Sequence, residues 1–216
     1  MKYKNIIFDF DGVLAESVQI KTEAFHQLYE KYGENIAEKV VEHHKANGGM
    51  SRFEKFPYYH KTFLNIDLSK EDIDKLSYHF SNLVVKGVID ADEVPGATWF
   101  LKKYYSKMKF WIVSATPTNE IRKIVKARNM SRYFEGVWGS PELKSSIVSR
   151  LIQTEKLNNN ETIFFGDAMA DYRAAENNNI NFFLRETSDN YDMFKKNHQL
   201  IRFKDIFELE SILKNL

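Results

Sequence analysis

The hydrophobic pattern divides the chain into segments of two kinds. Residues 6–8 form a short apolar run, typical of a buried parallel strand. Across residues 17–90 apolar positions recur with helical spacing, and no convincing β-branched strand interrupts them. Beyond the turn at Val94-Pro95-Gly96, short apolar runs alternate with amphipathic segments. The pattern therefore predicts one strand, a block of helices, and then alternating strands and helices.

This order of elements is typical of a doubly wound α/β fold. Helices of the block are expected at 18–32, 35–47, 52–64 and 69–86, with a capping box of Ser69 and Asp72 opening the last one. Later strands are expected at 109–113, 136–138, 162–165 and 181–184, and helices at 117–128, 143–156, 168–178 and 205–213. We expect a Rossmann-like parallel-sheet core domain over residues 1–16 and 93–216, with an inserted all-α helical cap domain over residues 17–92.

Composition excludes several classes of function. The chain has 216 residues, and its 31 basic and 30 acidic side chains give a net charge of +1 without a long run of one sign. This balance argues against nucleic acid as a partner. The absence of cysteine excludes disulfides and thiolate chemistry. No leader pattern or membrane-length apolar stretch is evident. We expect a cytoplasmic protein that does not act at a membrane, and no obligate protein partner is evident.

The first candidate motif follows the first strand. Asp9 and Asp11 are separated by Phe10, and Gly12 opens a turn. In an open α/β sheet the ligand crevice lies beyond the carboxyl ends of the strands. Two carboxylates placed there repel each other and lose water, so a divalent cation is the simplest compensation. An acidic strand end that only makes a turn is the alternative.

The second candidate motif, residues 112–117, runs from an apolar strand into a helix. The Ser114 hydroxyl and nearby backbone N–H groups can donate hydrogen bonds to a phosphate oxygen. Pro117 suits the first turn of the helix that follows. The alternative is a plain helix N-cap at Ser114 or Thr116.

Two further motifs follow. Lys144 lies at the start of an expected helix, where a cation is unfavourable and a nearby anion would offset the cost; an exposed lysine is the alternative. Asp167 ends an apolar strand, and Asp171 follows one helical turn later, so both can point to one spot. For Asp171 the alternative role is to complement the charge of the helix N-terminus.

These four motifs, in this order and with a helical insert after the first, resemble the haloacid dehalogenase-like (HAD) hydrolase superfamily. Within it they are similar to the subgroup of phosphoglycolate phosphatases and β-phosphoglucomutases, which share the helical cap. The resemblance implies that Asp9 is a nucleophile and that Lys144 contacts both it and a phosphate. It also implies a Mg²⁺ site of Asp9, the backbone carbonyl of Asp11 and Asp167, with Asp171 nearby. Catalytic Ser114 and substrate-binding Gly12, Ala115 and Thr116 complete the expected core site.

The resemblance favours one reaction among several. Asp11 can protonate a leaving alkoxide and then deprotonate the attacking water. We expect a Mg²⁺-dependent phosphatase that hydrolyses a small phosphorylated metabolite, with a sugar phosphate as one candidate, through an aspartyl-phosphate. A phosphomutase of the β-phosphoglucomutase type is the alternative, but Lys21 stands where that subgroup has a cap histidine. A catalytically silent HAD-fold binding protein would be expected to lose one of the motif residues, and all are present.

The substrate is expected to be chosen by the cap. Arg52, in Gly49-Met50-Ser51-Arg52, can grip a phosphate or carboxylate that is not transferred; the alternative is a helix N-cap at Ser51 with a solvated Arg52. We expect hinges near 15–17 and 93–96 to let the cap close. Further residues expected to line the chamber are Lys21, Lys55, Tyr58, Tyr59 and His60, whereas Phe53, Phe56 and Phe63 are expected to form the core of the cap.

Overall fold

The computed structural model describes residues 2–216 and contains one parallel sheet. Its strands are β1 (Asn5–Phe8), β2 (Lys109–Pro117), β3 (Gly136–Ser140), β4 (Thr162–Gly166), β5 (Asn181–Arg185) and β6 (Ile201–Phe203). They lie in the order β3-β2-β1-β4-β5-β6, which is the order of a doubly wound Rossmann-like sheet. The predicted α/β fold class is confirmed.

Both faces of the sheet are covered by helices. Ile6 and Phe8 of β1 belong to the core on one face, and Ile7 belongs to the core on the other, as the two-residue period of a strand requires. The first face is covered by α5 (Ala97–Tyr104), α6 (Thr118–Ala127) and α10 (Ile206–Lys214). The second is covered by α7 (Lys144–Thr154) and α8 (Met169–Asn177), with α9 (Tyr191–Phe194) nearby. This burial explains why the central strands contain continuous apolar runs, such as residues 6–8, 110–113 and 163–165.

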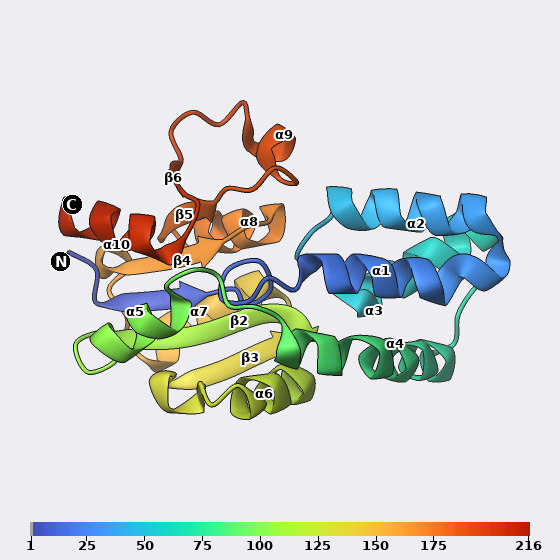
Figure 1. Cartoon of the computed structure of the whole chain (residues 1–216), viewed down its shortest axis with the longest axis horizontal. Coiled ribbons are helices and arrows are strands. Elements are labelled where there is room, and N and C mark those ends of the chain that lie inside the picture. Colours follow the sequence, from blue (N-terminus) through green and yellow to red (C-terminus); the bar gives the residue numbers. More distant parts are fainter. Residues whose placement is uncertain (1) are drawn as a thin grey trace.

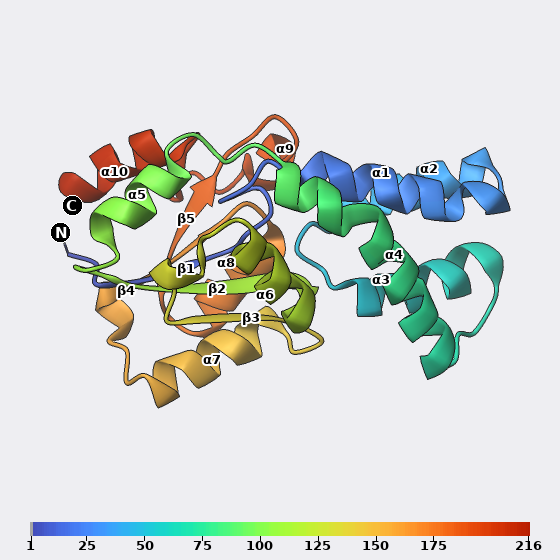
Figure 2. The same cartoon turned by 60° about the horizontal axis from the view of Figure 1, so that its bottom comes forward.

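Four helices form a separate group at one end of the sheet (Figures 1 and 2). They are α1 (Val18–Tyr29), α2 (Glu34–Ala46), α3 (Arg52–Tyr59), which continues into a π-helical turn (His60–Leu64), and α4 (Lys70–Asp90). We call these helices the cap. Phe25, Phe56 and Phe80 pack together inside it. Within residues 2–216, every helix is too short or too polar to cross a membrane.

The chain passes between the core and the cap twice, and the two crossings run side by side. Glu16 N donates to Asp92 O at 2.9 Å, and Val94 N donates to Leu14 O at 3.2 Å. Ala15 and Glu93 form an antiparallel bridge between these bonds. The two crossings are therefore tied to each other at the positions where hinges are expected.

The structure differs from the predicted elements in a few places. Helices α5 and α9 and strand β6 were not predicted. The prediction that Pro117 lies in the first turn of a helix is wrong: strand β2 continues to Pro117, which pairs with Ser140 of β3 and has ψ near 139°. The predicted capping box of α4 is confirmed, because Asp72 N donates to Ser69 Oγ at 3.2 Å and Ser69 N donates to Asp72 Oδ2 at 3.1 Å.

Candidate active site

Asp9 follows β1 at the point where the strand order reverses, between β2 and β4. The carboxylate is 4% exposed and is held on both oxygens. Phe10 N donates to Oδ1 at 2.7 Å, and Lys144 Nζ donates to Oδ2 at 2.7 Å. These bonds fix the orientation of the side chain, while each oxygen keeps a lone pair for a metal or a phosphorus atom.

Three carboxylates gather at this sheet edge around one ammonium group. Oxygens of Asp9, Asp167 and Asp171 lie within 4.8 Å of one another, and Lys144 Nζ also donates to Asp171 Oδ1 at 2.6 Å. Burial and then the neighbouring Asp9 raise the pKa of Asp167 well above its ordinary value. Burial raises the pKa of Asp171 to about 7, although Lys144 opposes the shift. One lysine does not balance two buried acids and the half-buried Asp167, so the cluster is deficient in positive charge.

A divalent cation fits this cluster. All the donors are hard carboxylate oxygens, which Mg²⁺ prefers, and Mg²⁺ keeps several waters and so needs few protein ligands. Gly12 enables the close approach: its φ is +75°, and a Cβ there would lie 2.2 Å from Asp167 Oδ2. The structure thus brings together Asp9, Asp167 and Asp171 as candidate metal ligands, with Asp11 following two residues after Asp9.

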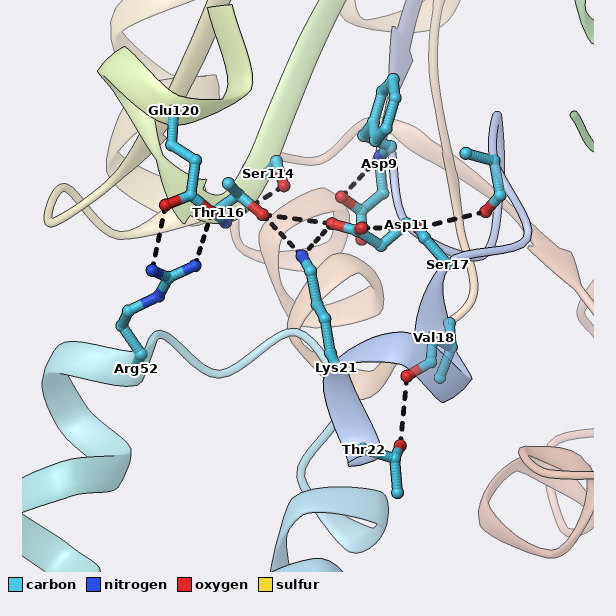
Figure 3. A network of polar contacts seen from close by, with 12 residues as sticks. Asp9, Asp11, Ser17, Val18, Lys21, Thr22, Arg52, Ser114, Thr116 and Glu120 are labelled. Atoms are coloured by element: carbon cyan, nitrogen blue, oxygen red, sulfur yellow. Dashed lines mark hydrogen bonds and ion pairs between the residues drawn. The ribbon is translucent and has the colours of Figure 1, made fainter. Parts of the chain in front are cut away.

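Asp11 has a separate hydrogen-bond network that reaches into the cap (Figure 3). Its Oδ1 accepts from Ser17 Oγ at 2.6 Å, and its Oδ2 accepts from Lys21 Nζ and, at 3.2 Å, from Thr116 Oγ1. Lys21 Nζ also donates to Thr116 Oγ1 at 2.6 Å. Burial by itself raises the pKa of Asp11, but Lys21 and these hydrogen bonds outweigh it and hold the pKa below its ordinary value. Lys21 therefore keeps Asp11 ionised in this arrangement.

The second motif places two of its three expected residues on the cavity. Ala115 and Thr116 line it, whereas Ser114 is 1% exposed and its Oγ accepts a hydrogen bond from Thr116 N at 3.1 Å. Ser114 therefore supports the irregular last part of β2, and Thr116 is the hydroxyl that contacts the Asp11 network.

A cavity of about 360 Å³ lies between the sheet edge and the cap. The core contributes Asp9, Asp11, Gly12, Thr116 and Asp167 to its lining, and the cap contributes Lys21, Phe25, His44, Arg52 and Lys55. The prediction that Tyr58, Tyr59 and His60 line the chamber is wrong. Tyr59 and His60 pack with Tyr29 in the interior of the cap, and Tyr58 stacks on His43. Tyr58, Tyr59 and His60 follow Arg52 and Lys55 in the sequence but lie in a different part of the cap.

Arg52 lies in the cap and forms an ion pair with a residue of the core. It is 4% exposed, and its two terminal nitrogens donate to Glu120 of α6 at 3.0 and 2.7 Å (Figure 3). Ser51 caps α3 in a full capping box, as one of the two alternatives supposed, but Arg52 is not solvated. The guanidinium that was expected to grip substrate is therefore held by a carboxylate of the protein in this arrangement.

Arg185, at the end of β5, and Asn190, directly before α9, shape the site and were not predicted. Arg185 donates to Gly12 O at 2.9 Å and forms a two-bond ion pair with Glu16. Asn190 Nδ2 donates to the backbone oxygen of Asp167 at 2.8 Å. Arg185 ends an apolar strand at the same sheet edge as Asp9 and Asp167, so the strand-end rule that identified those residues also applies to it.

Solved structures of other proteins share the fold described above. Solved structures that share the fold include β-phosphoglucomutase from Clostridium difficile, with a TM-score of 0.78 and 23% identity over 98% of this chain and 96% of that one. A predicted phosphatase from Clostridium acetobutylicum has a TM-score of 0.76 and 16% identity over 99% of both chains. A predicted phosphoglycolate phosphatase from Haemophilus somnus has a TM-score of 0.75 and 16% identity, also over 99% of both.

No curated protein sequence gives a significant match to the chain. The model of one protein family, described as haloacid dehalogenase-like hydrolase, matches residues 6–184, a span that contains all four motifs and the cap. The chain therefore belongs to the haloacid dehalogenase-like hydrolase family, whose fold it shares with phosphatases and phosphoglucomutases.

Proposed function

We propose that the chain is a Mg²⁺-dependent phosphatase that hydrolyses a small phosphorylated metabolite through an aspartyl-phosphate on Asp9. One observation carries the proposal. The Asp9 carboxylate is oriented by Lys144 within a cluster of three acids that has only this one positive charge among residues 2–216, and Asp11 follows two residues later. A phosphoryl group needs charge compensation and positioning more than covalent assistance, and this arrangement supplies both.

In the first step an Asp9 oxygen attacks phosphorus and the bond from phosphorus to the ester oxygen breaks. Asp11 donates a proton to the departing alkoxide. In the second step Asp11 accepts a proton from the water that attacks the aspartyl-phosphate, which releases inorganic phosphate and regenerates Asp9. Lys144 holds Asp9 and stabilises the negative charge throughout. Asp9, Asp167 and the backbone carbonyl of Asp11, with Asp171 nearby, would hold a Mg²⁺ ion, which would supply further positive charge to compensate the phosphoryl group.

The first step requires a protonated Asp11, which its ion pair with Lys21 opposes. We propose that the bound ester resolves this conflict, because a phosphoryl oxygen competes with Asp11 for the Lys21 ammonium. In the second step the ionised form of Asp11 is the one required, and the contact with Lys21 favours it. Lys21 thus takes part in setting the protonation state of Asp11.

Phosphate release from a panel of phosphorylated metabolites tests the proposal. We expect EDTA to abolish release, Mg²⁺ to restore it, and Ca²⁺ to inhibit, because the larger and looser coordination of Ca²⁺ misplaces the nucleophile. Full turnover in metal-free buffer would contradict the metal requirement. Conversion of a hexose 1-phosphate to the 6-phosphate with little free phosphate would show a phosphomutase instead.

A further inference from the structure

Lys55 is a buried lysine whose amino group has no carboxylate partner within residues 2–216. Its side chain lies on α3, is 1% exposed and lines the cavity. Among residues 2–216, its Nζ makes one side-chain hydrogen bond, a donation to His44 Nδ1 at 2.8 Å, and no carboxylate oxygen lies within 4.0 Å. An ammonium group has three N–H donors, so two of them are left for another acceptor.

Three other cationic side chains that line the cavity each have a carboxylate partner. Lys21 is paired with Asp11, Arg52 with Glu120, and Arg185 with Glu16. Burial and then the nearby Lys21 lower the pKa of Lys55 to about 7. A buried charge without a partner destabilises a protein unless it is compensated or serves a ligand. The missing partner of Lys55 is thus an anion that the protein itself does not provide.

His44 adds a second donor at the same place. Burial and then Lys55 lower its pKa to about 2, so the imidazole is neutral. Because Nδ1 accepts from Lys55, the proton of the neutral ring is on Nε2, for which residues 2–216 supply no hydrogen-bond partner. His44 also lines the cavity. Lys55 and His44 together present an ammonium and an imidazole N–H.

We infer that Lys55 and His44 form an anion subsite in the cap that binds a second acidic group, a carboxylate or a phosphate, on the leaving portion of the substrate. This inference rests on the proposed function, since the first phosphoryl group is assigned to Asp9 and the metal cluster. The substrate class is accordingly a metabolite with two acidic groups, one at each side of a cavity of about 360 Å³. Arg52 is not needed for this contact, because its guanidinium already donates two hydrogen bonds to the Glu120 carboxylate.

Matched substrates test the subsite. Phosphate monoesters of linear alcohols with two to five carbons are compared in three series, ending in a hydroxyl, a carboxylate or a second phosphate. We expect the wild-type chain to prefer one acidic series at one chain length by about tenfold or more in kcat/KM, the gain of one charged contact. Lys55→Met should remove this preference while changing kcat/KM for the hydroxyl series less than about threefold. The series that shows the preference identifies the anion.

Lys45 provides the matched control, because it also lines the cavity but is exposed to solvent. Lys45→Met should keep the preference. Lys55→Met should also raise the Tm by about 2–4 °C, because it replaces a buried charge by an apolar chain of similar length. A lower Tm would show that Lys55 is a structural element of the cap and would overturn the inference. Equal losses on acidic and neutral esters would overturn it as well.

A binding measurement distinguishes failure of the subsite inference from failure of the proposed function. Calorimetry with Asp9→Asn, which has no nucleophile, measures affinity for the same esters without turnover. If the wild-type chain hydrolyses none of them, the proposed function fails, while tighter binding of an acidic series that Lys55→Met abolishes still supports the subsite. If neutral and acidic esters are hydrolysed and bound equally well, the subsite is wrong and the phosphatase stands.

Discussion

Compared across the cavity, the sheet edge and the cap differ in which charge lacks a partner. At the sheet edge, Asp9 and Asp171 share the Lys144 ammonium group, and Asp167 lies beside them without an ion pair among residues 2–216. In the cap, Lys55 has a neutral histidine and no carboxylate. The first region is short of a cation and the second is short of an anion. A metal-bound phosphate ester with a second acidic group would satisfy both, and this complementarity relates the two halves of the site.

The two regions also differ in how their contacts are made. Asp9 and Asp167 follow directly after strands β1 and β4, and Asp171 lies in the first turn of α8, so the topology of the sheet brings them together. The cap reaches the core through side chains that are far apart in sequence, such as Arg52 with Glu120 and Lys21 with Thr116. We expect changes at the sheet edge to abolish chemistry, and changes in the cap to alter specificity and stability.

The largest effect is expected from Asp9→Asn. It removes the nucleophile, and kcat should fall by roughly 10⁴-fold or more for every substrate. Steady-state phosphate release measures the loss, and thermal unfolding checks that the variant is folded. Retention of more than a few per cent of the activity would mean that another group attacks phosphorus.

Asp11→Asn should have a smaller effect that depends on the leaving group. With an alkyl phosphate, loss of the acid should lower the rate by about 10²–10⁴-fold. With p-nitrophenyl phosphate the first step should be partly rescued, because p-nitrophenolate leaves without a proton. A burst of p-nitrophenol measured in stopped flow would report the spared first step. Equal losses for the two esters would argue against an acid role for Asp11.

The sequence predicts the sheet edge far better than the cap. An apolar run that ends in an aspartate is a local signal, and it located Asp9 and Asp167 correctly at strand ends. The ion pair of Arg52 with Glu120 has no such signal, because its partners lie on α3 and α6 and meet only in the folded chain. Strand β6 is three residues long, too short to show a period. Helix α5 carried a usable signal, since its buried residues Ala97, Phe100, Leu101 and Tyr104 have helical spacing.

The Arg52–Glu120 pair gives the next prediction. Glu120→Gln removes the negative charge that compensates the buried Arg52 guanidinium, and we expect the free energy of unfolding to fall by about 3 kcal/mol. Urea unfolding of Glu120→Gln, Arg52→Met and the double variant measures the coupling between the two side chains. Additive losses in that cycle would show that the pair does not connect the cap to the core.

The smallest expected change in stability comes from the N-terminal capping boxes of α3 and α4. Only one of them is expected to affect activity. Ser51→Ala and Ser69→Ala each remove an N-cap, and each should lower the free energy of unfolding by about 1 kcal/mol. Only Ser51→Ala should also lower kcat/KM, because α3 carries Arg52 and Lys55, which line the cavity, whereas Ser69 caps α4 and does not line it. If both variants lowered kcat/KM equally, the cap would act as one rigid body.

The most direct test of the central claim is the chemical identity of the intermediate. Asp11→Asn is mixed with p-nitrophenyl phosphate and Mg²⁺ and quenched in acid, because this variant should form the aspartyl-phosphate but lack the base that hydrolyses it. We predict that mass spectrometry finds one phosphoryl group on the peptide that contains Asp9, and none after the same treatment of the Asp9→Asn, Asp11→Asn double variant. A phosphoryl group on any other residue, or its persistence in the double variant, would contradict the assignment of Asp9 as the nucleophile.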